Sequence, residues 1–378
     1  MQATVAPSAA SRRAMAAPIP RLAPVTKAVL PSRRRPSIFS CIKPPELCQY
    51  CQVIGGDEVL STFVTIDFEA PSRRFLHICY CCADTDAVVN FYVNVLDMKE
   101  VMRNPIHPSD GSLLGIEGEI VSGAAFVYDK RGPRTSASLE VQEWVSPKMI
   151  GAPISDASRV GMQAVGFGVP DVAVMIERML AAGSHLVSRS SSPWVKNWAT
   201  LTDPFGTQVD LMQDENIPLG ESRLRHLRIN VTDIDASVSW YHGMGFLDVA
   251  EHVLDNGDFV GLRVADGSAA VGRVLRMKMP DEAAELVLTQ WMNPASHGQH
   301  PVDANHAGLF RTAVGVDDTV ASYERFLADG WKFEREPRQV ELEGTAVPDM
   351  WICFLNDPDG VPFEFVQRPR SAFRPERA

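Results

Sequence analysis

The 378-residue chain has no apolar run near the ~18 residues that a membrane-spanning helix needs, so we expect no membrane partner. Its first 45 residues also contain no acidic side chain, while they carry eight basic ones. The net charge of the whole chain is −11, and without those eight basic residues the remainder carries −19. An acidic body of this kind argues against nucleic acid as a partner.

The chain also lacks the paired cysteine spacing of a disulfide framework. Its seven cysteines are Cys41, Cys48, Cys51, Cys79, Cys81, Cys82 and Cys353. Three of them crowd into one short strand-like run, which favours reduced thiols in a cytoplasmic protein. The spacing Cys48-x-x-Cys51 is half of a zinc knuckle, but no second pair follows at the usual distance.

Residues 1–58 are rich in alanine, proline, serine and arginine and show no helical or strand period, so we expect a disordered basic tail. The acid-free start resembles an organelle transit peptide, although its prolines would break an amphipathic helix. A leader unrelated to function is the alternative. We therefore predict a cytoplasmic protein and leave organelle targeting by residues 1–45 open.

The dominant pattern in the rest of the chain is internal repetition. A short apolar strand, a capping aspartate and an amphipathic helix begin at Phe75 and recur at Leu224. The matching pairs, each 149 residues apart, are His77 with His226, Asp84 with Asp233, and Tyr92 with Tyr241. The chain is therefore predicted to be an internal duplication.

Each half contains a weaker second copy of the same pattern. Its helices end at Gly183 and Gly330, and its last two strands flank an Asp-Pro-x-Gly turn. The order strand, helix, three strands thus occurs four times. One such unit leaves a sheet face exposed, so units must pair. We predict an α+β fold of four βαβββ modules, paired into two domains at 74–214 and 223–368, each a curved mixed sheet around a cleft.

These repeats resemble the vicinal oxygen chelate superfamily, which includes glyoxalase I, bleomycin-resistance proteins, extradiol dioxygenases and methylmalonyl-CoA epimerase. The resemblance covers roughly residues 74–368. The motifs that carry it are His77-Ile-x-Tyr-x-x-x-Asp84, His226-Leu-x-Ile-x-Val-x-Asp233, Asp203-Pro-x-Gly-x-x-x-Asp210 and Asp357-Pro-Asp-Gly-x-x-x-Glu364. It implies the fold strongly, but it does not select one function.

The resemblance also implies a divalent metal cation (Ni, Mn, Fe, Co or Zn), held by the first and last strands of each module. In the first domain these positions are His77, Glu140, Ala164 and Asp210, and Gln163 could fill the gap at Ala164. In the second domain they are His226, Val287, Arg311 and Glu364. His306 could join His226 and Glu364 as a third ligand there. Alternatively, Arg311 and Glu364 form a buried ion pair and the second domain holds no metal.

The function that the resemblance implies first is a metal-dependent isomerase or epimerase that abstracts a proton next to a carbonyl and stabilises an enediolate. Asp210 or Glu364 would be the base. The small-molecule substrate would be an α-hydroxy ketone or a cyclitol, as in the 2-epi-5-epi-valiolone type epimerases. Alternatives are an extradiol-type or 4-hydroxyphenylpyruvate-type iron dioxygenase, and a metal-free binding or resistance protein that holds its ligand with Trp144, Trp194, Trp198 and Trp291. A homodimer is left open, because such modules can pair across chains.

Overall fold

The computed structural model describes residues 72–368, except 193, 255–258, 263, 265, 266 and 342–348. The described residues all lie within one compact unit, residues 64–378. The predicted tail at 1–58 and the half zinc knuckle of Cys48 and Cys51, with Cys41 upstream, lie outside the described residues. Among the described residues all four cysteines are free thiols.

The described chain folds into four modules, each a strand, a helix and three further strands. Module 1 contains β1 (Ser72–Cys82), α1 (Thr85–Asn94), β2 (Lys99–Asp110), β3 (Glu119–Tyr128) and β4 (Ser138–Ser146). Module 2 contains β5 (Gly161–Val169), α2 (Val172–Ala181), β6 (His185–Ser190), β7 (Trp198–Thr202) and β8 (Gln208–Gln213). Module 3 contains β9 (Arg223–Asn230), α3 (Ile234–Met244), β10 (Leu247–Leu254), β11 (Val271–Lys278) and β12 (Glu285–Asn293). Module 4 contains β13 (Gly308–Val316), α4 (Thr319–Ala328), β14 (Arg338–Glu341), β15 (Asp349–Asn356) and β16 (Pro362–Gln367). Short 3₁₀ helices lie at η1 (Gly111–Leu114) and η2 (Phe259–Gly261).

Each of the four described α-helices begins at an aspartate whose side chain accepts hydrogen bonds from amide groups of the first turn. The capping residues are Asp84, Asp171, Asp233 and Asp318. Each has an extended backbone, as an N-cap requires, and its carboxylate also lies at the positive end of the helix dipole. The predicted fourfold order of elements is confirmed.

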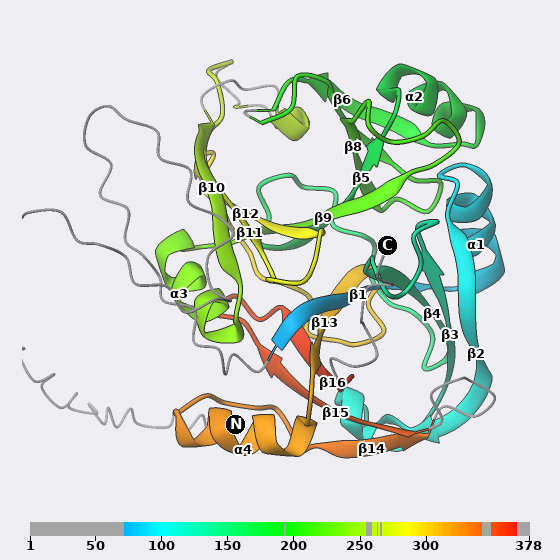
Figure 1. Cartoon of the computed structure of the whole chain (residues 1–378), viewed down its shortest axis with the longest axis vertical. Helices are drawn as coiled ribbons and strands as arrows, with labels where there is room; N and C mark the ends of the chain where they lie inside the picture. The colour runs from blue at the N-terminus through cyan, green and yellow to red at the C-terminus, as the bar shows by residue number, and fades with distance from the viewer. Residues whose placement is uncertain are drawn as a thin grey trace, which may run out of the picture. The chain divides into compact units, whose positions relative to one another are not determined.

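The modules pair differently from the prediction. Modules 1 and 4 form one eight-stranded sheet, in the order β14-β15-β16-β13-β1-β4-β3-β2, which we call sheet A. Modules 2 and 3 form the other, in the order β10-β11-β12-β9-β5-β8-β7-β6, which we call sheet B. Figure 1 shows β1, in blue, lying beside β13, although the two strands come from opposite ends of the described chain.

The expected pairing within each half of the sequence is therefore wrong. Antiparallel pairs between first strands, β1 with β13 and β5 with β9, connect the halves instead. All four first strands are mostly buried, so their burial is compatible with either pairing. The two sheets do not coincide with the stretches 74–214 and 223–368. These boundaries stay a prediction for the domains.

Consecutive modules still contact each other, through one large hydrophobic core that includes residues from all four modules. Buried tyrosines donate hydrogen bonds across these contacts. Tyr80 and Tyr92 of module 1 both donate to Asp203 of module 2, over 3.0 and 3.1 Å. Tyr241 of module 3 donates to Asp357 of module 4 over 2.8 Å. None of the helices in the described part of the chain is long and apolar enough to cross a membrane.

Candidate metal centre

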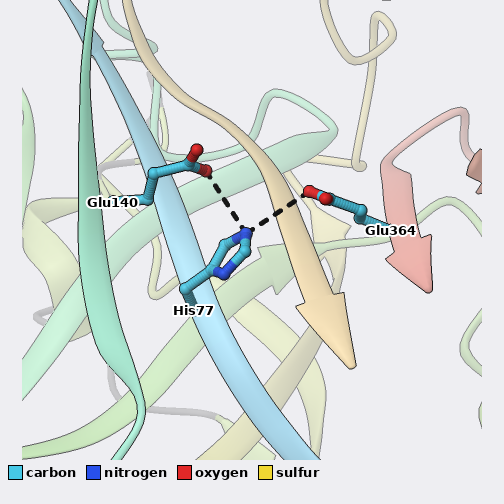
Figure 2. Close-up of side chains that lie close together, drawn as sticks. All are labelled: His77, Glu140 and Glu364. Carbon is cyan, nitrogen blue, oxygen red and sulfur yellow. Dashed lines mark ion pairs between the residues drawn. The ribbon is translucent and has the colours of Figure 1, made fainter. Parts of the chain in front are cut away.

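Three buried side chains converge on the inner face of sheet A. They are His77 on β1, Glu140 on β4 and Glu364 on β16. The Nε2 atom of His77 lies 3.3 Å from an oxygen of Glu140 and 3.4 Å from an oxygen of Glu364. Figure 2 shows the two carboxylates pointing at the imidazole from different strands. Within the described residues, this is the one group of three or more side chains arranged to hold a metal ion, with donor atoms within 4.8 Å of one another.

Strand order explains why these residues meet. β1 lies at the centre of sheet A, parallel to β4 on one side and antiparallel to β13 on the other. β16 follows β13, and Glu364 lies level with Ala313, which in turn lies level with His77. Side chains that alternate toward one face therefore gather over the middle of the sheet.

Arg311 of β13 completes this cluster. Its Nη2 atom lies 3.0 and 2.9 Å from the two oxygens of Glu140, and its Nε atom lies 3.4 Å from Glu364. Its Nη1 atom donates to Gln142 over 2.8 Å. Gln142 was not among the predicted site residues. It lies two residues after Glu140 on the same strand face, and that spacing is the signal that could have found it.

Both carboxylates of the cluster share one buried guanidinium, that of Arg311. Burial alone would raise the pKa of the Glu364 carboxyl, but the adjacent His77 and the charge of Arg311 hold it below its ordinary value. The buried Nε2 atom of His77 makes no well-formed hydrogen bond, although two carboxylates lie near it. The Nε2 atom of His77 and the carboxylates of Glu140 and Glu364 thus face a common point.

A cavity of about 530 Å³ lies over this cluster. His77, Glu140, Arg311 and Glu364 contribute to its polar wall. Its apolar wall comes from both modules of sheet A and includes Leu76, Met102, Phe126, Met350, Ile352 and Phe354. A concave apolar cavity with a few convergent polar groups is the usual form of a small-molecule site.

The equivalent residues in sheet B form a buried network of ion pairs and hydrogen bonds. Asp210 of β8 lies 3.1 Å from Nε2 of His226 and 2.9 Å from Nε of Arg228 on β9, and it also accepts from Thr200. Trp198 stacks on the His226 ring, with centroids 5.3 Å apart. Asp210 and Arg228 are completely buried. Burial would raise the pKa of Asp210, but Arg228 and His226 lower it to about 2.

The predicted ligand groups are therefore wrong as groups. Asp210 belongs to sheet B and does not join His77 and Glu140, and Glu364 joins those two rather than His226. His306 meets neither cluster: it bridges to Ile150, and its Nδ1 atom lies 3.1 Å from its neighbour's carbonyl oxygen. Pairing of modules across the halves of the chain causes the first two differences, whereas His306 lies in the loop before β13.

Gln163, which was expected to fill the gap at Ala164, donates to the carbonyl of Arg159 rather than turning toward a site. Val287, which occupies a ligand position but cannot bind a metal, packs in an apolar cluster of sheet B. The predicted ion pair of Arg311 with Glu364 forms, although Glu140 is the closer partner. Three of the four tryptophans considered as ligand-binding residues are buried in hydrophobic clusters: Trp144, Trp198 and Trp291.

A duplicated βαβββ fold with an imidazole-carboxylate cluster in one concave sheet defines a class of small-molecule metalloproteins. The chain belongs to the glyoxalase/bleomycin resistance protein/dioxygenase superfamily, whose sequence profile matches residues 74–211 and 223–365. This superfamily contains enzymes that depend on divalent metals, and the group of His77, Glu140 and Glu364 is the candidate site for such an ion here.

Two relatives illustrate the similarity. The protein named "Probable lactoylglutathione lyase, chloroplastic" from Arabidopsis thaliana is 25% identical over 331 residues, which cover 86% of this chain and 81% of that protein. The lactoylglutathione lyase of Haemophilus influenzae is 28% identical over 150 residues, which cover 38% of this chain and 92% of that protein.

Among solved structures, glyoxalase I from Zea mays superimposes with a TM-score of 0.55 at 20% identity, covering 78% of this chain and 92% of that one. This likeness concerns the fold.

Proposed function

We propose that the protein is a divalent-metal-dependent isomerase that moves a proton next to a carbonyl group of a small molecule bound in the cavity of sheet A. The observation that carries this proposal is the convergence of His77, Glu140 and Glu364 on the floor of that cavity. The similarity to lactoylglutathione lyases supports an isomerase within this superfamily.

The residues present fit a divalent ion. One imidazole and two carboxylates suit Ni, Mn, Fe, Co or Zn, and the unsatisfied Nε2 atom of His77 faces the same point as both carboxylates. Bound there, the ion would act as a Lewis acid on neighbouring substrate oxygens and stabilise the negative charge that develops when the proton leaves.

The side chains would divide the remaining work. Glu364 lies on the cavity wall and its lowered pKa keeps it ionised, so it can accept a proton from a carbon atom held above it. The apolar wall excludes water from the developing charge, which strengthens each electrostatic contact. Asp210, the other predicted base, is enclosed by Arg228, His226 and Thr200 and does not line the cavity of sheet A.

Of the more specific functions predicted from the sequence, a cyclitol epimerase is compatible with this proposal, because it would use the same proton transfer on a ring carbon. An iron dioxygenase of the extradiol type is less well supported, because iron oxygenases use two histidines and one carboxylate, whereas this cluster has one histidine and two carboxylates. The hypothesis of a metal-free binding protein is weakened, because it relied on tryptophans as ligand-binding residues and most of them pack in hydrophobic clusters.

Metal content and proton exchange test the proposal together. Purified protein should contain or take up one equivalent of Ni, Mn, Fe, Co or Zn, and His77→Ala and Glu364→Gln should abolish this uptake. His226→Ala is the matched control, because His226 lies at the equivalent strand position but pairs with buried Asp210. It should lower stability and leave metal uptake unchanged.

The reaction class is tested in D₂O with lactoylglutathione, which has a proton next to its carbonyl, and with an α-hydroxy ketone. We expect metal-dependent exchange of that proton, seen by NMR, in the wild type and in His226→Ala. A wild type that takes up none of the five metals would contradict the proposal, and so would exchange that persists in Glu364→Gln.

Partners and compartment remain at the level of prediction. The cavity suits a small-molecule substrate, and the homodimer is untested. The word "chloroplastic" in the name of the Arabidopsis relative supports organelle targeting by residues 1–45 over a purely cytoplasmic location. A fluorescent fusion of residues 1–58 would distinguish the two.

A further inference from the structure

Arg311 occupies a position where the superfamily pattern places a metal ligand. It lines the cavity beside His77, Glu140 and Glu364, so it belongs to the same floor as the three candidate ligands. A guanidinium group has five N–H donors, no lone pair and a pKa too high for deprotonation. Arg311 therefore cannot bind a metal ion, and this site offers three protein ligands rather than four.

The guanidinium of Arg311 is held firmly in place. It is 5% exposed and contacts both oxygens of Glu140, one oxygen of Glu364 and the amide oxygen of Gln142. Glu140 and Gln142 come from β4, and Glu364 comes from β16, so strands on both sides fix its orientation. Arg311 cannot move away without leaving a buried charge unpaired, which is costly.

Arg311 changes the net charge of the site when a metal ion is bound. The two negative charges of Glu140 and Glu364 would cancel the charge of a divalent ion, and the His77 imidazole is neutral as a ligand, so the guanidinium leaves a net charge of one positive. That charge lies in a buried, low-dielectric position, where an electrostatic interaction is stronger than in water. A ligand that brings one negative charge to the floor of the cavity would balance it.

We propose that Arg311 determines specificity: it replaces one protein ligand by a fixed positive charge and so adapts the cavity to substrates whose reacting end carries an anionic oxygen, such as 2-oxo or 2-hydroxy acids. This inference rests on the proposed function, because it requires a divalent ion at the cluster. It adds the substrate class, which the ligand set alone does not give.

Pyruvate and pyruvamide are suitable probes, because they have nearly the same shape and differ in charge. Their affinities for the Mn-loaded protein are measured by isothermal titration calorimetry in the wild type, Arg311→Gln, Arg311→His and Arg311→Lys. A metal ion by itself prefers the anionic pyruvate to the neutral pyruvamide, so the ratio of pyruvate affinity to pyruvamide affinity in Arg311→Gln is the reference. We expect this ratio to be at least tenfold larger in the wild type and in Arg311→Lys than in the neutral variants Arg311→Gln and Arg311→His.

Metal affinity gives a second readout that does not depend on any substrate. Arg311→His adds a lone-pair donor and removes a like charge, so its dissociation constant for Co²⁺ should fall at least tenfold below that of the wild type. Arg228→Gln is the matched control, because Arg228 is also a buried arginine paired with a strand carboxylate, but in sheet B. It should keep the wild-type ratio of probe affinities and the wild-type affinity for Co²⁺.

The outcomes separate the two proposals. If the wild type and both neutral variants bind Co²⁺ but show the same ratio of probe affinities, the role of Arg311 is overturned and the metal site stands. If the wild type binds none of Mn, Co or Ni, both proposals are overturned. Should Arg311→Gln fail to fold, which its melting temperature with and without Co²⁺ would reveal, Arg311→His supplies the neutral comparison.

Discussion

Asp203 and Asp357 show how one repeated residue serves the fold rather than the chemistry. Each begins an Asp-Pro-x-Gly turn, accepts hydrogen bonds from two amide groups of that turn and binds tyrosine hydroxyls of the preceding module. Burial raises the pKa of Asp203 to about 6 and that of Asp357 to about 7, against the effect of these hydrogen bonds. Each aspartate therefore couples the packing of two modules to pH.

The first prediction concerns Asp357. Its pKa is raised on folding, so its contribution to stability is fully present below the unfolded value of about 4 and is lost as pH rises toward about 7. In Asp357→Asn, the amide can keep the turn contacts and donate to Tyr241 without becoming charged. The free energy of unfolding of the variant, relative to wild type, should therefore increase with pH between these values, by up to about 1.4 kcal/mol per pH unit.

Urea unfolding at pH 4.5, 6 and 8 measures this difference. Asp203→Asn is the companion variant, and its relative stability should rise over a narrower range, because the pKa of Asp203 is about 6. A difference between Asp357→Asn and wild type that does not change with pH would show that Asp357 is already ionised in the folded protein at low pH.

At the scale of elements, the two edges of sheet A meet near the cavity. β2 and β14 are the outermost strands of the sheet, yet Arg338 of β14 lies 2.8 Å from Asp110 at the end of β2. Arg335 donates to the carbonyl of Leu113 in η1 over 3.2 Å. Arg338 and Asp110 both line the cavity. The contact between η1 and β14 therefore closes one side of the site.

We predict that Arg338→Ala loosens this contact with little loss of global stability, because Arg338 is half exposed and exposed ion pairs contribute little. Amide hydrogens of η1 and of Gly115, which caps its C-terminal end, should exchange several-fold faster, and KM for the substrate of the proposed isomerase should rise more than kcat falls. Hydrogen exchange with mass spectrometry checks the first effect.

Arg103→Ala is the matched control for this variant, since Arg103 forms a similar exposed ion pair with Asp86 and Glu100 and does not line the cavity. It should leave exchange in η1 unchanged. Equal exchange in η1 for Arg338→Ala and wild type would show that the salt bridge does not hold the two edges together.

At the scale of the whole molecule, the sequence predicts the modules but not their partners. Strand alternation, capping aspartates and glycine-ended helices are local signals, so the order of elements could be predicted. Partner choice depends on which first strands meet, and β1, β5, β9 and β13 present nearly equivalent edges. The resemblance to the superfamily implied His77, Glu140 and Glu364 as ligands, yet their grouping required the pairing of β1 with β13. The role of Gln142 also depended on that pairing, because Arg311 reaches it from the neighbouring module.

The last prediction follows from this pairing. Leu219 and Gly220 lie in the loop between modules 2 and 3, where Leu219 is 87% exposed and Gly220 has a positive φ with open space around it. A protease site inserted there should be cleaved in the folded protein. Each sheet contains one module from each fragment and is joined by a pair of first strands, so the two fragments should stay associated.

Size-exclusion chromatography under native conditions should show the cleaved protein eluting with the intact one, with metal uptake retained. A cut at this position separates His77 and Glu140 from Glu364 in the covalent chain, so retained uptake would mean that the site is assembled from both fragments. Separation into two folded fragments, with the metal carried by the first, would instead support pairing within each half and a ligand set that does not include Glu364.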